Sequence, residues 1–349
     1  MFSKVILHFG LFSLMKSRTK SPLTSEQIDR LVRYHFGPDA KVGQVTELTG
    51  GWFNTAYLVT IPSRGFETVL KVAPEPGTEV HTYETNAMAI EIATTELIRE
   101  KTTVPVPKIY ASSFDRSIVN RDYFFMEKLK GKPWNMVKKH LSKVANRALE
   151  DKVADFQMQL NSLKGRWFGS VVLQDNGKIK EQSWYSAFSQ LVEWMISDYS
   201  RFGVIMPRGW TSIRDLLEKS RPAFDAVAEP RLVDWDLWQG NVFVSGYDTP
   251  APAITGIIDH ERALWGDPLM EFLFMVPKKY PALVAKYKGM IDFPDKAVRT
   301  RRAFYNLYFY LIIYLETYSR RYPFLFGLSI KAFARVGFKR TLMQIANLS

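Results

Sequence analysis

Three oxygen-bearing side chains flank two short apolar segments in the second half of the chain. Asp236 and Asn241 lie five residues apart, and Asp259 ends the next apolar segment after a turn at residues 245–248. The turn predicts a hairpin, which would bring the three side chains together at one end. Carboxylate and amide oxygens suit Mg²⁺, a cation that proteins usually share with substrate phosphates. The spacing therefore predicts a phosphotransfer site, provided that the rest of the chain supplies a nucleotide pocket.

The residues upstream of this segment predict a small sheet with one long helix. A capping box at Thr24 indicates the start of a first helix, before the sheet begins. Apolar segments separated by turns then predict five strands, and apolar residues at helical spacing predict the long helix. The expected strands are 45–48, 55–61, 67–72, 108–111 and 122–129, and the long helix is expected at about 80–101.

From about residue 134 the apolar residues recur at helical spacing, so a lobe boundary is expected near residue 130. We expect an N-terminal arm at 1–22, of which residues 1–14 form a start-site extension or a loose arm. A sheet-rich lobe at 23–130 and a helical lobe at 131–349 follow. The expected helices of the second lobe are 153–163, 184–199, 213–226, 278–290, 299–318 and 328–347.

Lys71 lies inside an apolar strand, which is an unusual place for a cation. It either points to solvent from an edge strand or is held inward by a carboxylate and a ligand phosphate. Glu84 and Glu91 lie seven residues apart on one helix face, so either could pair with Lys71. The Gly50-Gly51 turn has no Cβ atoms to keep a ligand away, although most such turns only join two strands.

Composition narrows the class of protein. The 349 residues include no cysteine, which excludes disulfides, thiolate metal sites and a cysteine nucleophile, and fits a reducing cytoplasm. The apolar segment 5–15 is too short to span a bilayer, and 303–315 is interrupted by Asn306 and tyrosines, so it is expected to be a buried helix.

The formal charge of +12 lies mostly at the two ends of the chain. Residues 1–20 hold four basic residues and 317–349 hold six, with no acid in either segment, which leaves about +2 for the body. Basic ends with interleaved aromatics could touch nucleic acid or an anionic membrane, or form a solvated helix face. No base-reading motif accompanies the charge, so nucleic acid is not an expected partner.

Six short motifs follow one another in the order and spacing of a known family. Together they make the chain resemble, over about residues 25–320, the aminoglycoside phosphotransferase and choline-kinase branch of the protein-kinase-like fold. The most specific match is residues 236–244, where the family has His-x-Asp-x-x-x-x-Asn before an apolar strand. The other motifs are residues 50–55, 70–72, 104–107, 257–263 and Gly266-Asp267-Pro268.

This resemblance implies an α+β, bilobal protein-kinase-like fold: a small antiparallel sheet lobe with one main helix, and a larger, mostly helical lobe. It implies an ATP-dependent phosphotransferase, with GTP as a possible alternative donor, that uses Mg²⁺ and a small-molecule hydroxyl acceptor. Phosphoryl transfer depends on positioning and charge neutralisation, which suits such a site.

The resemblance also implies roles for individual residues. Asp236 would be the catalytic carboxylate, and Asn241 and Asp259 would hold Mg²⁺. Lys71 would hold the phosphates, steadied by Glu91 rather than by Glu84, since Glu91 lies mid-helix. The remaining implied residues are Gly50, Gly51 and Asn54 near the phosphates, the linker residues Glu127 and Leu129 beside the adenine, and Asp267 as a brace for the catalytic loop.

Asp234 stands where the family usually has histidine. The aspartate could accept backbone N–H bonds and hold the loop differently, and it places a second carboxylate near Asp236. An alternative function follows, in which the chain binds nucleotide as a catalytically impaired pseudokinase.

The resemblance does not identify the phosphate acceptor, since acceptors in this family range from aminoglycosides and macrolides to sugars and amino-alcohols. The expected helix 299–318 would line its pocket, and a cationic acceptor would need carboxylates. The tyrosines of that helix could equally be core residues. The acceptor candidates are Glu271, Tyr305, Tyr308, Tyr314 and Glu316.

Overall fold

The computed structural model describes residues 19–51, 53–172, 180–205, 210–271, 281–287, 293–320 and 322–348. Its contacts divide the chain into two compact units. The first, here called the sheet unit, contains 1–80, 107–129 and 317–330, and the second, the helical unit, contains 81–106, 130–316 and 331–349. The predicted arm at residues 1–14 lies outside the described residues.

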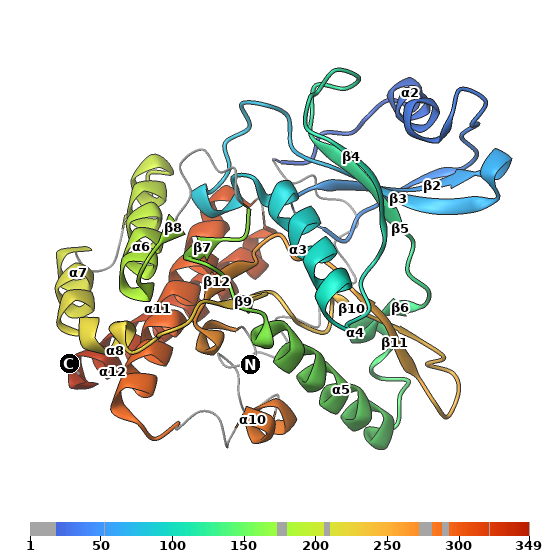
Figure 1. Ribbon diagram of the computed structural model, residues 1–349. Coiled ribbons are helices and arrows are strands. Elements are labelled where there is room, and N and C mark those ends of the chain that lie inside the picture. Colours follow the sequence, from blue (N-terminus) through green and yellow to red (C-terminus); the bar gives the residue numbers. More distant parts are fainter. Residues whose placement is uncertain are drawn as a thin grey trace. The chain divides into compact units, whose positions relative to one another are not determined.

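The sheet unit is built on a five-stranded antiparallel sheet with the order β1-β2-β3-β5-β4. Helix α2 (Ser25–Phe36) covers one face of it, packing its buried Ile28, Leu31 and Val32 on the sheet (Figure 1). The predicted capping box at Thr24 is present, which fixes where α2 begins. The strands are β1 (Val45–Leu48), β2 (Thr55–Ile61), β3 (Phe66–Val72), β4 (Ile109–Ser113) and β5 (Tyr123–Glu127), with a 3-10 turn η2 (Pro62–Arg64) between β2 and β3.

The helical unit consists of helices around two small antiparallel sheets, with the orders β11-β10-β6 and β8-β7-β12-β9. Its strands are β6 (Lys132–Pro133), β7 (Phe168–Ser170), β8 (Lys180–Glu181), β9 (Arg231–Val233), β10 (Val242–Ser245), β11 (Ala253–Ile257) and β12 (Leu264–Gly266). Its helices are η3 (Thr82–Glu84), α3 (Ala87–Lys101), α4 (Trp134–Val137), α5 (Lys143–Ser162), α6 (Trp184–Arg201), α7 (Trp210–Lys219), α8 (Arg221–Asp225), η4 (Pro268–Met270), α10 (Pro281–Tyr287), α11 (Lys296–Ser319) and α12 (Phe324–Leu348), of which 317–319 and 324–330 belong to the sheet unit.

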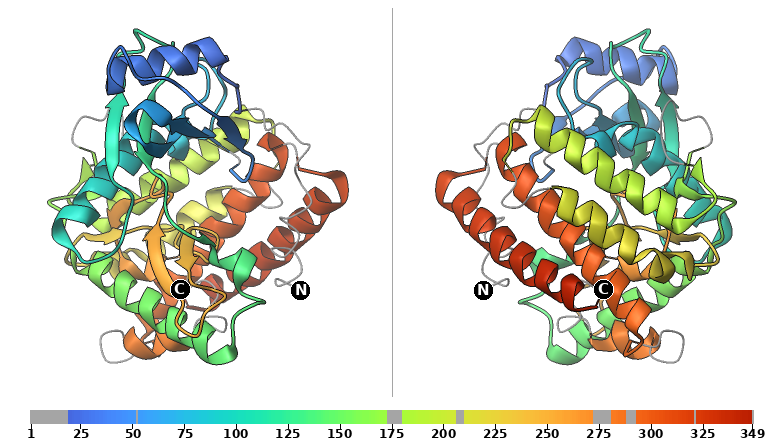
Figure 2. Two further views of the ribbon diagram at one scale, coloured as in Figure 1. Left: turned by 90° about the vertical axis from the view of Figure 1, so that its right-hand side faces the viewer. Right: turned by 90° about the vertical axis from the view of Figure 1, so that its left-hand side faces the viewer.

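Two apolar clusters form the core of the helical unit. One joins α6, α8, α11 and α12, and its centre is aromatic: the Phe188 and Tyr305 rings each contact those of Trp184 and Phe224. Within this unit α12 lies against α11 (Figure 2), since Arg335 donates to the Tyr314 hydroxyl. The second cluster joins α3, α4 and α5 to β10 and β11. The two clusters hold the strands that carry the predicted site.

A close backbone approach fixes the start of the β6–β10 pairing. Gly131 has φ 88°, and a Cβ atom there would lie 2.1 Å from the Val244 carbonyl oxygen. Only glycine fits such a position without a shift of the backbone. The segment 130–133 of the helical unit therefore runs directly along β10.

The fold class is confirmed: a small antiparallel sheet and a larger, mostly helical part. The predicted helix at 80–101 is interrupted, because Asn86 has φ 59° and separates the 3-10 turn η3 from α3. By its contacts α3 belongs to the helical unit, whereas the sequence assigned it to the sheet-rich lobe. The lobe limits 23–130 and 131–349 stay a prediction.

The predicted helix 299–318 corresponds to α11, whose apolar residues are mostly buried, as expected. Among the residues that the structure describes, no helix is both long and apolar enough to cross a membrane.

Candidate active site

The predicted hairpin is formed by β10 and β11, and it brings the metal-ligating candidates together. Val242 pairs with Ile257, and the Ile258 N–H donates to the Asn241 carbonyl at 3.0 Å, so Asp259 directly follows a residue bonded to Asn241. The Asn241 side-chain amide donates to the carbonyl of Asp236 at 3.0 Å. Asn241 therefore links the loop that carries Asp236, residues 234–241, to the strand that ends at Asp259.

Two residues of this region adopt the left-handed backbone conformation, which non-glycine residues rarely do. Trp235 has φ 62° and Asp259 has φ 74°. The conformation is strained for a bulky residue such as tryptophan and is kept only where the surroundings enforce it. Backbone strain of this kind concentrates at active sites and ligand clamps, and here it falls on residues that adjoin or belong to the predicted site.

Asp234, the departure from the family pattern, lies in a buried pair with His260. The Asp234 carboxylate lies 3.0 Å from Nδ1 of His260, and both side chains are at most 2% exposed. Burial by itself lowers the pKa of His260, but the charge and hydrogen bond of Asp234, together with the charges of Glu91 and Asp259, outweigh burial and leave that pKa raised. The pair joins the 234–241 loop to the segment after Asp259, so Asp234 has a positioning role in this fold.

Replacing Asp234 by asparagine should weaken this link without removing it. The amide keeps an oxygen that can accept from the imidazole, but the charge is lost, which costs about 1.5 kcal/mol of unfolding free energy. Urea unfolding measures the change, with Asp248→Asn, in the exposed turn after β10, as the matched control. Equal stability of the two variants would show that the pair contributes nothing.

Glu271 is a brace for the loop, and its predicted role as an acceptor ligand is wrong for this structure. Its side chain is fully buried and accepts the backbone N–H groups of Asp234, at 3.1 Å, and Trp235, at 3.0 Å. It also accepts from the side-chain amide of Asn161 at 2.9 Å. Burial raises the pKa of Glu271 to about 8, with the Asp234 charge acting in the same direction.

A cluster of three acidic side chains adds to the predicted metal ligands. Oxygens of Glu91, Asp259 and Glu261 all lie within 4.8 Å of one another, and such an oxygen set suits a hard divalent cation. The sequence identified Asp259 as a metal ligand and Glu91 as a partner of Lys71, but missed Glu261. Its signal was the position of a second carboxylate two residues after Asp259. The Glu84 carboxylate accepts the His81 N–H.

Asp236 is only partly exposed, and its surroundings set its proton affinity. Burial raises the pKa of the Asp236 carboxyl to about 7, against the opposing charge of Arg262 and with reinforcement from Asp259. A carboxylate with a pKa near neutrality is well matched to accept a proton from a hydroxyl group. The position predicted to be catalytic therefore has the acid–base property that the role requires.

Arg262 occupies the space between two aromatic rings. Its guanidinium lies 5.0 Å from the ring centre of Tyr83 and 5.7 Å from that of Trp235. It also donates to Glu316 at 3.0 Å, and the Tyr83 hydroxyl donates to the same carboxylate oxygen at 2.7 Å. Glu316, a predicted acceptor ligand, is thus bound to an arginine that the sequence reasoning did not identify.

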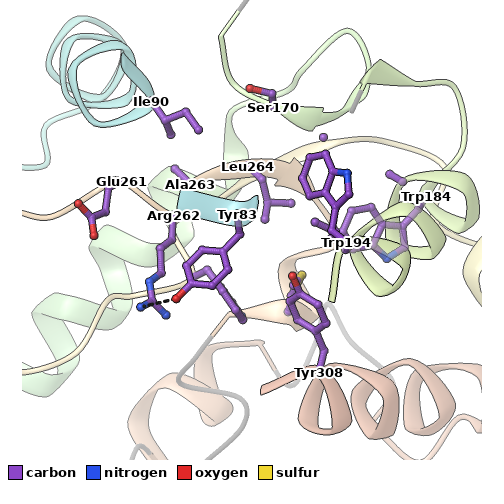
Figure 3. Close-up of a pocket in the computed structure, with 15 residues that line it drawn as sticks. Tyr83, Ile90, Ser170, Trp184, Trp194, Glu261, Arg262, Ala263, Leu264 and Tyr308 are labelled. Atoms are coloured by element: carbon purple, nitrogen blue, oxygen red, sulfur yellow. Dashed lines mark hydrogen bonds between the residues drawn. The ribbon is translucent and has the colours of Figure 1, made fainter. Parts of the chain in front are cut away.

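A pocket opens beside this group in the helical unit (Figure 3). It encloses about 570 Å³ of empty space, part of it open to solvent. Tyr308 on α11, a predicted acceptor residue, lines it. The other lining residues come from η3, α3, the β7 strand, α6, the 234–241 loop and the 261–270 segment: Tyr83, Ile90, Gly169, Ser170, Trp184, Ala187, Leu191, Trp194, Trp235, Glu261, Arg262, Ala263, Leu264 and Met270.

The remaining tyrosine candidates are core residues, as the alternative reading of that helix held. The Tyr305 hydroxyl donates to Asp267 at 2.7 Å and accepts from the Trp184 indole at 2.6 Å, all in the interior. Tyr314 is buried and does not line the pocket. Asp267 also caps the turn η4 through Leu269 and binds Arg301, so it braces η4 and α11.

The predicted phosphate-binding residues lie in the sheet unit. Lys71 is on β3, between β2 and β5, and is 9% exposed, so the edge-strand interpretation is wrong. A Cβ atom on Gly50 would meet no other atom within 4 Å, so the fold itself does not require glycine there. Pairing of Lys71 with Glu91 stays a prediction. The other candidates are Gly51 in the same turn, Asn54, which is buried, Glu127, which accepts the Lys108 N–H, and Leu129, which follows β5.

These features define a class. They are typical of a protein-kinase-like fold for small-molecule phosphotransfer. The sheet unit has a small antiparallel sheet with a buried lysine on its third strand. The helical unit has an Asp-x₄-Asn loop, followed by a hairpin whose second strand leads to an aspartate. The chain belongs to the phosphotransferase enzyme family APH, whose family model matches residues 44–311.

Solved structures agree with this fold. A Ralstonia eutropha protein assigned provisionally as an aminoglycoside phosphotransferase is 14% identical, with a TM-score of 0.61 over 93% of this chain and 99% of that one. The GDP complex of aminoglycoside 2′-phosphotransferase-IIIa is 17% identical, with a TM-score of 0.55 over 93% and 98%. Plasmodium vivax ethanolamine kinase is 11% identical, with a TM-score of 0.58 over 93% and 92%. A search of curated protein sequences finds no match.

Proposed function

We propose that the protein transfers the γ-phosphoryl group of ATP or GTP, bound with Mg²⁺, to a hydroxyl group of a small molecule. The observation that carries the proposal is the convergence of Asp236, Asn241 and Asp259 at one end of the β10–β11 hairpin. The GDP complex of a structurally similar phosphotransferase is the reason to test GTP beside ATP.

The proposed reaction makes one bond and breaks one bond. The acceptor oxygen forms a bond to the γ-phosphorus, and the bond between that phosphorus and the β,γ-bridging oxygen breaks, which releases the nucleoside diphosphate. Asp236 orients the hydroxyl and takes its proton. Arg262, whose charge acts on Asp236, keeps the aspartate partly ionised at neutral pH.

The oxygen donors near Asp259 fit a magnesium ion. Asp259 and Glu261 would supply carboxylates from one segment and Glu91 a third from α3. Asn241, whose amide nitrogen is bonded to the Asp236 carbonyl, would supply its amide oxygen. When bound, Mg²⁺ would neutralise phosphate charge. The bond from the Asn241 amide to the Asp236 carbonyl fixes the position of this proposed metal ligand relative to the proposed general base. We also propose that the nucleotide phosphates bind near Gly50, Gly51, Asn54 and Lys71. The purine ring of the nucleotide would lie beside the 127–129 linker.

The proposal has an alternative, a protein that binds nucleotide without transferring phosphate. Its motivation is Asp234 in place of histidine. The buried bond from Asp234 to His260 supports the active form, since the loop is held by a different pair instead of being left unsupported.

The absence of cysteine supports the cytoplasm as the proposed compartment.

Purified protein should bind Mg²⁺–ATP or Mg²⁺–GTP, and chelation of the metal by EDTA should abolish both binding of the triphosphate and transfer. Asp259→Asn should raise the Mg²⁺ concentration for half-maximal activity at least tenfold, because one anionic ligand is lost. Calorimetric titration and a phosphotransfer screen over sugars, amino-alcohols, aminoglycosides and neutral alcohols measure these effects. Glu100→Gln, at an exposed acid on α3 outside the cluster, is the control.

Binding of the Mg²⁺–nucleotide with no product from any acceptor would favour the pseudokinase. No binding of either nucleotide would refute the proposal itself.

A further inference from the structure

The pocket in the helical unit is aromatic. Five of its lining residues are Tyr83, Trp184, Trp194, Trp235 and Tyr308, and they come from four separate parts of the unit. In Figure 3 the rings of Trp184, Trp194, Tyr83 and Tyr308 lie around one space. A pocket of a few hundred cubic ångström with apolar walls and few polar groups is typical of small-molecule sites.

The pocket lies next to the proposed base. Trp235, in its left-handed conformation, immediately precedes Asp236 in the loop, and Arg262 both lines the pocket and acts electrostatically on Asp236. Asp236 itself does not line the pocket, but a molecule there would contact Trp235, the residue before it, and Arg262, whose charge acts on it. This adjacency makes the pocket the place for the body of the acceptor.

The charges in the pocket disfavour a cationic acceptor. An aromatic cage attracts a cation to its ring faces, but here Arg262 already lies over Tyr83 and Trp235. A second cation would meet the charge of Arg262 at short range. The guanidinium is held there by Glu316, so it cannot leave without breaking an ion pair whose side chains are at most 22% exposed.

The acidic side chains nearby are committed to other partners. Among the described lining residues Glu261 is the one acid, and its oxygens lie with Glu91 and Asp259 in the metal-ligating cluster. Figure 3 draws Glu261 on the other side of Arg262 from Trp184 and Trp194. Glu316 accepts from both Arg262 and Tyr83. None of the described residues that line the aromatic part of the pocket is a carboxylate that could receive an ammonium group.

We infer that the acceptor of this phosphotransferase is a neutral alcohol with a ring-bearing, largely apolar body, and that amines such as aminoglycosides and amino-alcohols are excluded by Arg262. The inference rests on the proposed function, since it assigns the acceptor of that same site. The apolar body packs against Trp184, Trp194 and Tyr308, and the hydroxyl group is directed to Asp236.

A matched pair of probes tests the sign of this preference. 3-Phenylpropan-1-ol and phenylalaninol share a phenyl ring and a primary hydroxyl, and differ by one amino group that is protonated at pH 7. We expect the neutral probe to bind at least tenfold more tightly, measured by ligand-observed NMR or by tryptophan fluorescence without nucleotide. With Mg²⁺–ATP or Mg²⁺–GTP, the neutral probe should also show the higher kcat/KM.

Two pairs of variants locate the preference in the pocket. Arg262→Gln removes the cation and its ion pair with Glu316, so it should shift the ratio of affinities at least tenfold towards phenylalaninol. Arg262→Lys keeps a positive charge and should keep the preference for the neutral probe. Trp194→Ala should weaken binding of 3-phenylpropan-1-ol at least fivefold, whereas Trp194→Phe keeps an aromatic wall and should retain it. Because Trp194 and Arg262 lie on different elements, α6 and the segment after β11, one pair of variants remains informative if the other does not fold.

The outcomes separate this inference from the proposed function. Equal or tighter binding of phenylalaninol to the native protein, or no binding of the neutral probe, overturns the inference even if phosphate is transferred to some amine. Tighter binding of the neutral probe to the native protein, reduced by Arg262→Gln and kept by Arg262→Lys, supports the inference. A neutral preference without any nucleotide binding would sink the proposed function and leave the pocket's ligand class standing.

Discussion

Asp236→Asn should lower phosphotransfer about 10³-fold while the protein remains folded and still binds nucleotide. Loss of a positioned general base typically costs between about 10²-fold and 10⁴-fold in rate. The loop should survive the change because Asn241 donates to the backbone carbonyl of residue 236, which the variant keeps. An asparagine side chain can still orient a hydroxyl group, so KM for the acceptor should change much less than kcat.

Steady-state kinetics with saturating Mg²⁺–nucleotide measures this effect, and thermal unfolding checks the fold. Asp248→Asn, an aspartate in the exposed turn after β10, is the matched control and should retain full activity. Retention of more than a tenth of the native kcat by Asp236→Asn would assign the proton transfer to another group. Loss of nucleotide binding alongside kcat would instead indicate that Asp236 acts on the nucleotide.

The hairpin, and the nearness of Asn241 to the end of β11, could be predicted because both depend on local sequence. Two apolar segments joined by a short turn determine the pairing of Val242 with Ile257, and the pairing places Asn241 beside the residues that end β11. The sequence leaves two interpretations of Lys71 open, since it does not reveal which strand lies at an edge of the sheet. The observed order, with β3 between β2 and β5, settles that question.

The supports of the site were not predictable, because they depend on contacts between distant residues. Glu271 was assigned to the acceptor on the ground that a carboxylate would attract a cation, yet it folds back onto the loop 36 and 37 residues earlier. Likewise, His260 becomes a partner of Asp234 only in three dimensions. A carboxylate that braces the loop and one that binds substrate look alike in a sequence.

Glu271→Ala should be the most damaging single change to the stability of the helical unit among these residues. It would leave the N–H groups of Asp234 and Trp235, and one N–H of Asn161, without their buried acceptor. Each buried donor without a partner costs about 1–3 kcal/mol, so the loss should be on the order of 4 kcal/mol. Trp235 would also lose a restraint on its left-handed backbone, so activity should fall even in the folded fraction.

Glu271→Gln separates the charge from the shape. Because burial raises the pKa of Glu271 from its ordinary 4.5 to about 8, the folded state binds its proton more tightly than the unfolded state. The stabilisation from this proton is complete below about pH 4.5 and is lost progressively as pH rises towards 8. The native protein should therefore lose stability, relative to Glu271→Gln, between pH 5 and about pH 8, and the difference should level off above that.

Urea unfolding of the native protein and both Glu271 variants at about pH 5, 6.5 and 8 measures these differences. Glu150→Gln is the control, because burial also raises the pKa of this carboxyl on α5. Glu150 is only partly buried, so its substitution should change the pH dependence of stability less than Glu271→Gln does. Parallel stability profiles of Glu271→Gln and the native protein would mean that Glu271 is already ionised at pH 5. In that case three N–H donors, and not a retained proton, hold its carboxylate in the interior.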